Sequence, residues 1–284
     1  IIFYSYCMKR FIQIFLLLAV VSTAGTAQNL KGLKVLLFTK NGKGYVHDNI
    51  PAAKHCFDSL SRKFGFDLII NDDPAVFHRD FLSKIDLIVF ASTNNAVFDT
   101  DDQRLAFRQF IQAGGLFLGI HSVLGTERNW TWFKQMMGGT FAWHPRFQPF
   151  HVVNLRPDHA SVKHLPPVWK RQDECYFIKE MYPGPHTLMA ADINSLAMDP
   201  ADTARIRIHR GTFGRFYPSV WEHRYDGGLA WITALGHAAT DYSEPVFVSH
   251  LMNAIIYLKA QKKKLDFSKA YATRFDDEVR HQGI

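Results

Sequence analysis

The sequence predicts an α/β protein whose core is a parallel β-sheet. Four continuous apolar runs in the first half of the chain have the pattern of strands that are buried on both faces. These runs lie at residues 34–39, 66–70, 85–91 and 116–120. Helical segments follow the first and the third run, and strands that alternate with helices form parallel β-α-β units. The 284-residue chain is 47% hydrophobic, which is enough for one sizeable core.

Two helices in this half have recognisable ends. Residues 49–64 fit the first helix, because Pro51 suits a first helical turn. Residues 98–115 have the amphipathic pattern of the second, with Asp99 or Thr100 as the N-cap. A glycine stands at the end of each helix, where a left-handed residue commonly terminates helical structure.

The second half of the chain has a different pattern. Short β-like runs are separated by turn residues such as "PGP" (183–185) and "DGG" (226–228). The runs lie at residues 151–155, 175–180, 187–191, 205–209, 218–225 and 229–236. We interpret them as extra strands and long loops inserted above the sheet. A final helix is expected at 243–261 with Ser243 as its N-cap, and no internal repeat or linker indicates a second domain.

The first residues have the pattern of a secretory signal peptide. Basic residues follow Met8, then comes an apolar run (11–21) too short to span a membrane, then small residues ending at Ala27. The seven residues before Met8 have the character of upstream sequence, and no lipobox cysteine follows the leader. We therefore expect a soluble periplasmic or secreted protein, cleaved near Ala27. The chain would divide into a leader (1–27), a domain (28–261) and a charged tail that is partly disordered or loosely packed (262–284).

The charge distribution does not favour nucleic acid as a partner. The formal net charge is +7, and it falls to +5 once Lys9 and Arg10 leave with the leader. Apart from "KKK" at 262–264 the basic residues are scattered, without a stripe of Lys and Arg interleaved with aromatic residues. An exported protein could join Cys56 to Cys175, but two cysteines do not make a disulfide framework, and we do not expect this bridge.

Three histidines follow predicted strands, at the place where α/β sheets bind ligands. His47 lies in the loop after the first strand, His121 directly follows the fourth, and His237 follows the last β-like run. The carboxyl ends of parallel strands meet at one rim, so these side chains are expected to converge. Polar clusters in clefts tend to be functional. The alternative is that each histidine is a hydrogen-bonded structural residue.

The segment "GGLFLGIHS" (114–122) places His121 where many α/β enzymes carry a serine or cysteine nucleophile. Ser122 follows the apex of the turn, so acyl-enzyme chemistry is not expected there. A histidine can act as a general acid, a general base or a metal ligand. His47, His121 and His237 would suit a divalent metal such as zinc. Their spacing in the sequence neither supports nor excludes a shared metal site.

Other side chains complete the candidate site. Asp173 and Glu174 precede an apolar run, and each is a candidate acid or base beside His121. A solvated strand end is the alternative reading of this pair. Tyrosine, asparagine, tryptophan and histidine side chains in loops at the rim could contact a sugar by hydrogen bonding or stacking. The candidates for substrate binding are Tyr45, Asn94, Trp143 and His144.

Several of these motifs together resemble the ThuA-like (trehalose utilisation) family. The similarity covers roughly residues 33–258 and rests on "LLFTKNGKGYVHDNIPAA", "GGLFLGIHS", "GGTFAWHP", "DECYF" and "LGH" in the family order. The resemblance implies a class I glutamine amidotransferase-like fold, that is, a flavodoxin-like three-layer sandwich with a mostly parallel central sheet. True amidotransferases hold a catalytic cysteine at the turn where this chain has His121. The resemblance therefore implies the scaffold without glutaminase chemistry.

The family pattern also implies a site. It points to the histidines at 47, 121, 144 and 237 and to the acidic pair 173–174. Our leading hypothesis is an exported enzyme, a hydrolase, lyase or isomerase acting on a keto-sugar or disaccharide derivative. The expected partner is a small-molecule carbohydrate, with no nucleic acid and no membrane after leader cleavage, and a homo-oligomer stays open. The alternatives are a non-catalytic carbohydrate-binding or scaffold protein and a hydrolase that uses Ser122.

Overall fold

A nine-stranded β-sheet forms the middle layer of the computed structural model, which describes residues 29–209 and 213–280. The strand order is β2-β1-β3-β4-β11-β10-β9-β6-β7. The strands are β1 (Lys34–Phe38), β2 (Asp67–Ile70), β3 (Leu87–Ala91), β4 (Leu116–Ile120), β6 (Gln148–Asn154), β7 (Val168–Asp173), β9 (His186–Asp192), β10 (Phe216–Tyr225) and β11 (Gly228–Thr233). The predicted leader lies outside the described residues.

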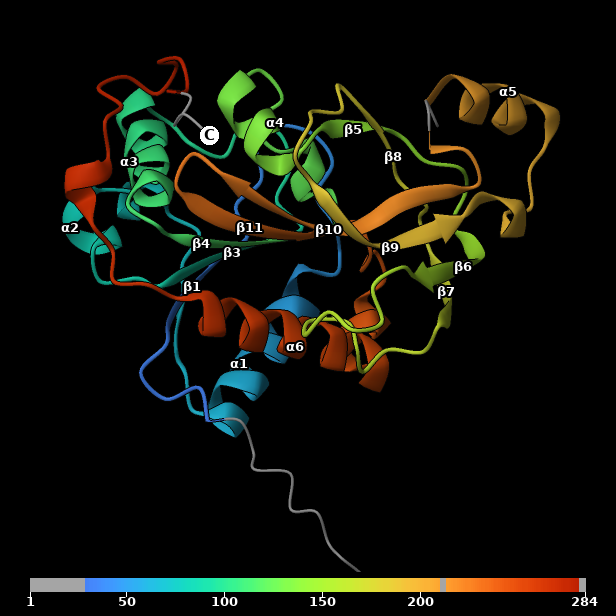
Figure 1. Cartoon of the computed structure of the whole chain (residues 1–284), viewed down its shortest axis with the longest axis horizontal. Helices are drawn as coiled ribbons and strands as arrows, with labels where there is room; N and C mark the ends of the chain where they lie inside the picture. Colours follow the sequence, from blue (N-terminus) through green and yellow to red (C-terminus); the bar gives the residue numbers. More distant parts are fainter. Residues whose placement is uncertain (1–28, 210–212, 281–284) are drawn as a thin grey trace, which may run out of the picture.

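Helices cover both faces of the sheet, as Figure 1 shows. On one face lie α1 (Ile50–Phe64) and α6 (Pro245–Gln261), and on the other lie α3 (Asp101–Gln112) and α4 (Thr131–Met137). Every residue of β3 and β4 is buried because both faces of these strands are covered. This arrangement is the expected three-layer α/β sandwich, so the predicted fold class is confirmed.

The half of the sheet that carries the predicted histidines is entirely parallel. β1 pairs in parallel with β2 and β3, and β4 pairs in parallel with β3 and β11. The predicted second helix begins as expected, since Thr100 and Gln103 form a capping box at the start of α3. The carboxyl ends of β1, β3, β4 and β11 therefore meet at one rim.

Most of the second-half strands extend this same sheet, so the expectation that they are inserted above it was wrong for these strands. β10 pairs antiparallel with both β11 and β9, and β6 pairs antiparallel with both β9 and β7. The reversal from β10 to β11 uses Asp226 (φ 47°) and Gly227 (φ 96°), whose left-handed backbones suit a tight hairpin. A separate two-stranded sheet is formed only by β5 (Thr140–Trp143) and β8 (Phe177–Lys179) among the described strands.

Two local predictions were also wrong. The N-cap of α6 is Glu244, whose carboxylate accepts hydrogen bonds from the Val246 and Phe247 amides, and not the predicted Ser243. The run 205–209, expected as a strand, belongs to helix α5 (Pro200–His209). Its alternating pattern resembles that of a strand. However, the Asp199 side chain accepts a hydrogen bond from the Asp202 amide and so caps a helix that begins at Pro200. The short helices α2 (Arg79–Leu82) and α4, and strands β5 and β7, have no counterpart in the prediction.

The described part of the tail, residues 262–280, packs against α3 rather than lying loose. Arg108 of α3 is fully buried and donates hydrogen bonds to the carbonyl oxygens of Phe275 (3.0 Å) and Glu278 (3.4 Å). The side-chain amide of Gln109 donates to the carbonyl of Ala272 (2.9 Å), which is itself buried. These contacts satisfy backbone carbonyls that a loose tail would leave to water.

The two cysteines in the described part of the chain do not form a disulfide. Cys56 and Cys175 are both free and buried, in line with the expectation of no bridge. Burial raises the pKa of the Cys56 thiol to about 11, so the thiol stays protonated.

Across 29–209 and 213–280, no helix has both the length and the apolar character needed to cross a membrane.

Candidate active site

His121 stands at a strained turn directly after β4. Its φ is 55°, a left-handed value that is uncommon for a residue with a side chain. Its Nδ1 atom lies 3.1 Å from the carbonyl oxygen of Ala234. A carbonyl only accepts hydrogen bonds, so Nδ1 carries the proton and the lone pair of neutral Nε2 faces the rim. The turn thus aims one unprotonated ring nitrogen at a fixed point.

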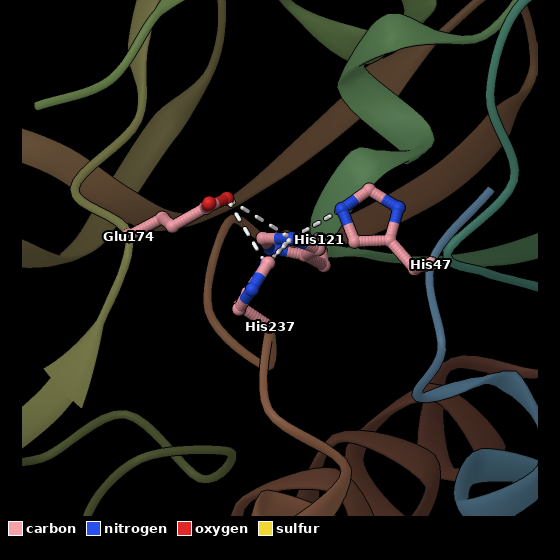
Figure 2. A group of neighbouring side chains, drawn as sticks. All are labelled: His47, His121, Glu174 and His237. Atoms are coloured by element: carbon pink, nitrogen blue, oxygen red, sulfur yellow. Dashed lines mark hydrogen bonds and ion pairs between the residues drawn. The ribbon is translucent and has the colours of Figure 1, made fainter. Parts of the chain in front are cut away.

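Three more side chains converge on this nitrogen (Figure 2). From Nε2 of His121 the distance is 3.1 Å to Nε2 of His47, 3.3 Å to Nδ1 of His237 and 3.6 Å to Oε2 of Glu174. The His237 and Glu174 atoms are 3.1 Å apart. All four atoms lie within 4.8 Å of one another. We call these four residues the histidine–glutamate cluster.

Each member of the cluster comes from a different segment of the chain. His47 lies in the loop between β1 and α1, and its Nδ1 is 3.1 Å from the hydroxyl of Ser122. Glu174 follows β7, and His237 lies in the loop after β11. The structure therefore brings together the three histidines that the rim argument predicted, and Glu174 with them.

The loop that carries His237 is held from two sides. The Asp173 carboxylate accepts hydrogen bonds from the backbone amides of Gly236 (2.8 Å) and His237 (3.2 Å). The Asn49 side-chain amide donates to the carbonyl oxygens of the same two residues, at 2.8 and 2.9 Å. Asp173 is itself fully buried and paired with Arg171 at 2.8 Å. It is placed to position the loop, and it does not reach the cluster as a catalytic group.

Burial sets the protonation of the cluster. Burial lowers the pKa of His47 to about 4, aided by the charge of His237, and lowers that of His121 well below its usual value. The hydrogen bond to Glu174 raises the pKa of His237. Burial opposes ionisation of Glu174, yet the hydrogen bond from His237 and the neighbouring histidines hold its pKa below the usual value. At neutral pH the cluster therefore offers the uncharged rings of His47 and His121 beside the Glu174 carboxylate.

The donor set fits a divalent cation. Imidazole nitrogen and carboxylate oxygen are ordinary zinc ligands at about 2.0–2.1 Å, and the edges of such a tetrahedron are about 3.3–3.4 Å. The four distances of 3.1, 3.1, 3.3 and 3.6 Å lie close to that edge length. A pair of ligand atoms at the widest separation, up to 4.8 Å, must approach by about 1.4 Å to reach this tetrahedral edge.

A cavity of about 390 Å³ opens beside the cluster. Its lining includes His47 and Glu174 together with three of the predicted substrate-binding residues, Tyr45, Asn94 and His144. Tyr45 is 62% exposed and packs edge-on against the His47 ring, and Nε2 of His144 lies 3.4 Å from Oε1 of Glu174. A ligand in the cavity would therefore touch both the cluster and the predicted contact residues.

Comparison with known proteins identifies the family. The family model described as ThuA, trehalose utilisation, matches residues 34–258. The chain belongs to the ThuA family. Carbohydrate metabolism is thereby established at the level of the family, and no curated protein matches the sequence.

Solved ThuA-like structures share the fold. A ThuA-like protein of Bacteroides uniformis has 20% identity and a TM-score of 0.66, covering 84% of this chain and 95% of that one. A ThuA-like protein of Parabacteroides merdae also has 20% identity, with a TM-score of 0.58 and coverage of 80% and 90%. At such identities the likeness shows the ThuA fold alone.

Trp143, predicted to bind substrate in this ThuA chain, does not line the cavity. It packs on Phe177 with ring centroids 5.7 Å apart, and Arg205 lies over its ring. The pairing of β5 with β8 is irregular between Phe141 and Trp143. A bulge of this kind breaks the alternation of side chains, so Phe141 reaches the cavity and Trp143 does not.

Two polar side chains of the cavity, Tyr176 and Arg128, were not predicted from the sequence. The Tyr176 hydroxyl lies 3.0 Å from Nε2 of His121, and burial raises the pKa of this phenol well above its usual value, so it remains a proton donor. Tyr176 stands two residues after Glu174, and extended chain places such residues on the same side. The spacing from Glu174 could therefore have predicted Tyr176. No sequence pattern indicated Arg128, because it follows the turn after β4 and not a strand end.

Proposed function

We propose that this ThuA-family chain is an exported enzyme that acts on a carbohydrate, such as a keto-sugar or disaccharide derivative, at the histidine–glutamate cluster. The cluster would hold a divalent cation such as zinc. The observation that carries the proposal is the meeting of three imidazole nitrogens and one carboxylate, from four separate segments, within 4.8 Å of one another beside a cavity.

The ligands would be Nε2 of His47, Nε2 of His121, Nδ1 of His237 and Oε2 of Glu174. A divalent cation held there supplies a Lewis acid that polarises an oxygen atom of the sugar. The contact between Ser122 and Nδ1 of His47 parallels that between Ala234 and Nδ1 of His121. Such partners fix the ring tautomer and orientation of a ligating histidine.

Proton transfer falls to residues at the edge of the cluster. The Tyr176 hydroxyl is protonated, buried and aimed at the cluster, so it can donate to an oxygen atom on which negative charge develops. His144 is half-buried and lies within 3.4 Å of Glu174, so it can carry a proton between the cavity and solvent. We therefore expect the largest losses of turnover when His121, Glu174 or Tyr176 is substituted.

The location of the protein is part of the proposal. The signal-peptide pattern in residues 1–27 supports export to the periplasm or secretion, with cleavage near Ala27. The scattered basic residues support a small-molecule partner and not nucleic acid. Mass determination of the mature N-terminus after expression of the full chain tests the cleavage.

Elemental analysis of the purified protein tests the cation. We expect about one equivalent of zinc or a similar divalent metal, lost in His121→Ala. Turnover of keto-disaccharides should be lost in the same variant. Two results together would contradict the cation site. The wild type would be free of metal after purification in metal-replete medium, and it would bind zinc no more tightly than His121→Ala does. Equal turnover by wild type and His121→Ala would contradict the role of His121.

Carbohydrate binding without catalysis is the alternative function. Exposed tryptophan side chains would suit such binding, because they stack on sugars, and the sequence has six tryptophans. Five of them are buried, namely Trp130, Trp132, Trp169, Trp221 and Trp231, and the sixth packs on Phe177. Calorimetric binding of a glycan with no product after long incubation would nevertheless establish this alternative.

A further inference from the structure

Arg128 has no acidic partner among the described residues, and its guanidinium lies over the Phe141 ring with its Cζ 5.5 Å from the ring centroid. It lies in the segment between the turn after β4 and helix α4, and it lines the cavity beside the cluster. Its Nη1 donates to the carbonyl oxygen of Phe141 and its Nη2 to Oδ1 of Asn94, both at 3.3 Å. Both acceptors are neutral. Within 29–209 and 213–280 the side chain forms no ion pair.

Three other buried or partly buried arginines of the described chain each have an acidic partner. Arg104 lies 2.9 Å from Glu127, Arg171 lies 2.8 Å from Asp173, and Arg108 lies 3.5 Å from Asp226. Burial lowers the pKa of Arg128 below its usual value, whereas the acidic partners of Arg104 and Arg171 raise theirs. A half-buried guanidinium without a carboxylate is costly to hold unless a ligand supplies the negative charge.

The chain also leaves room for this guanidinium. A Cβ atom at Gly125 would lie 2.5 Å from Nη2 of Arg128 and 2.5 Å from Oδ1 of Asn94. Any side chain at 125 would thus push the pair apart. Asn94 is in turn fixed, because its amide donates to the carbonyl of Tyr45 at 3.1 Å. The absence of a side chain at 125 keeps a preset donor group on the cavity wall.

We propose that Arg128 binds an anionic group of the substrate, a carboxylate or a phosphate, so that the cavity takes an acidic sugar. The planar guanidinium matches both anions with two parallel hydrogen bonds. The cavity volume of about 390 Å³ is near the lower end for ligand sites, which suits a sugar of one or two rings. This inference rests on the proposed function, in that the ligand of the cavity is taken to be a carbohydrate.

Calorimetric titration with matched probes tests the inference. The probes are glucose, glucuronate and glucose 6-phosphate, which share a ring and differ in charge. We expect at least one anionic probe to bind the wild type ten-fold or more tightly than glucose. Glucuronate and glucose 6-phosphate distinguish a carboxylate site from a phosphate site. The preference should vanish in Arg128→Gln and weaken in Gly125→Ala, while Arg79→Gln, a surface change outside the cavity lining, should keep it.

Metal content separates this inference from the proposed function. Arg128→Gln should retain the metal content of the wild type, because Arg128 does not contact the histidine–glutamate cluster. An anionic preference that survives in Arg128→Gln would show that the cluster, not Arg128, binds the anion and would overturn the inference. Failure of every anionic probe to bind more tightly than glucose would also overturn it, whatever the metal content or turnover.

Discussion

The hydroxyl oxygen of Ser122 lies 3.1 Å from Nδ1 of His47, while the opposite nitrogen of the same ring faces His121. This contact admits two chemical interpretations. Ser122 either orients a metal-binding imidazole or is a nucleophile whose proton His47 accepts. The two interpretations make opposite predictions for one variant.

We expect Ser122→Ala to weaken cation binding without abolishing catalysis. Loss of the hydroxyl frees the His47 ring, and loss of such an orienting partner typically costs about 10–100-fold in metal affinity. Turnover should return at saturating zinc. Competition with a chromophoric chelator measures the affinity. If the turnover of Ser122→Ala does not recover at saturating zinc, the result would favour Ser122 as a nucleophile. Release of ammonia from glutamine by the wild type but not by Ser122→Ala would favour the same role.

We expect Asp173→Asn to displace the loop of His237. The carboxylate accepts from the Gly236 and His237 amides, and the new amide nitrogen cannot accept in its place. Cation affinity should fall about ten-fold or more through this positioning role. Asp241→Asn is the control, because Asp241 also pairs with Arg171 at 2.8 Å without holding those two amides. Equal losses of affinity in both variants at equal stability would contradict this role.

We expect Arg108→Met to release the tail from α3. The change removes the donors to the carbonyls of the tail and leaves the buried Asp226 without its cation, which typically costs about 3–5 kcal/mol of folding free energy. Urea unfolding gives the free energy, and limited proteolysis with mass spectrometry locates the cleavage. The control is Arg274→Met, a change at an exposed residue, which should alter neither the free energy of unfolding nor the sites of proteolytic cleavage. A tail that stays protected in Arg108→Met would show that other contacts hold it.

We expect the free energy of unfolding to fall as pH drops below about 6.5, in part because of His250. This side chain is fully buried, and burial lowers its pKa well below the usual value. The unfolded chain then binds a proton that the native chain does not, so acidification favours unfolding. One such group contributes about 1.4 kcal/mol per pH unit between its two pKa values.

His250→Gln isolates this contribution. Glutamine can keep the hydrogen bond that joins Nε2 of His250 to the Thr233 hydroxyl at 3.2 Å, but it does not titrate. Urea unfolding at pH 5 and pH 7.5 should show a smaller difference in the variant than in wild type. An unchanged difference would mean that His250 is not the group that titrates.

The parallel half of the fold was predictable because its signals are local. Continuous apolar runs and glycine-terminated helices identify strands and helices without knowledge of their partners. The antiparallel half depends on pairing between distant segments, such as β6 with β9, which no local pattern specifies. The run 205–209 failed for a related reason, since its alternation fits a strand while the preceding Asp199 and Pro200 start a helix.

The site was predictable where strand ends supply it. His47, His121 and His237 follow strands, so the geometry of a parallel sheet brings them together. Adjacent residues in one loop were not distinguishable. Asp173 turns into the core toward Arg171 while Glu174 turns to the cluster, and only the folded structure separates them. Arg128 stands apart from any strand end and needed the cavity to reveal it.

The four members of the histidine–glutamate cluster are spread from residue 47 to residue 237, and no two come from the same segment. No fragment that lacks the loop after β1 or the loop after β11 can therefore contain the cluster. A partly folded chain with most of its helices formed would still lack it. Saturable cation binding would count only the fully assembled molecules in a refolding mixture, so it would give a direct titration of refolding yield before any substrate is known.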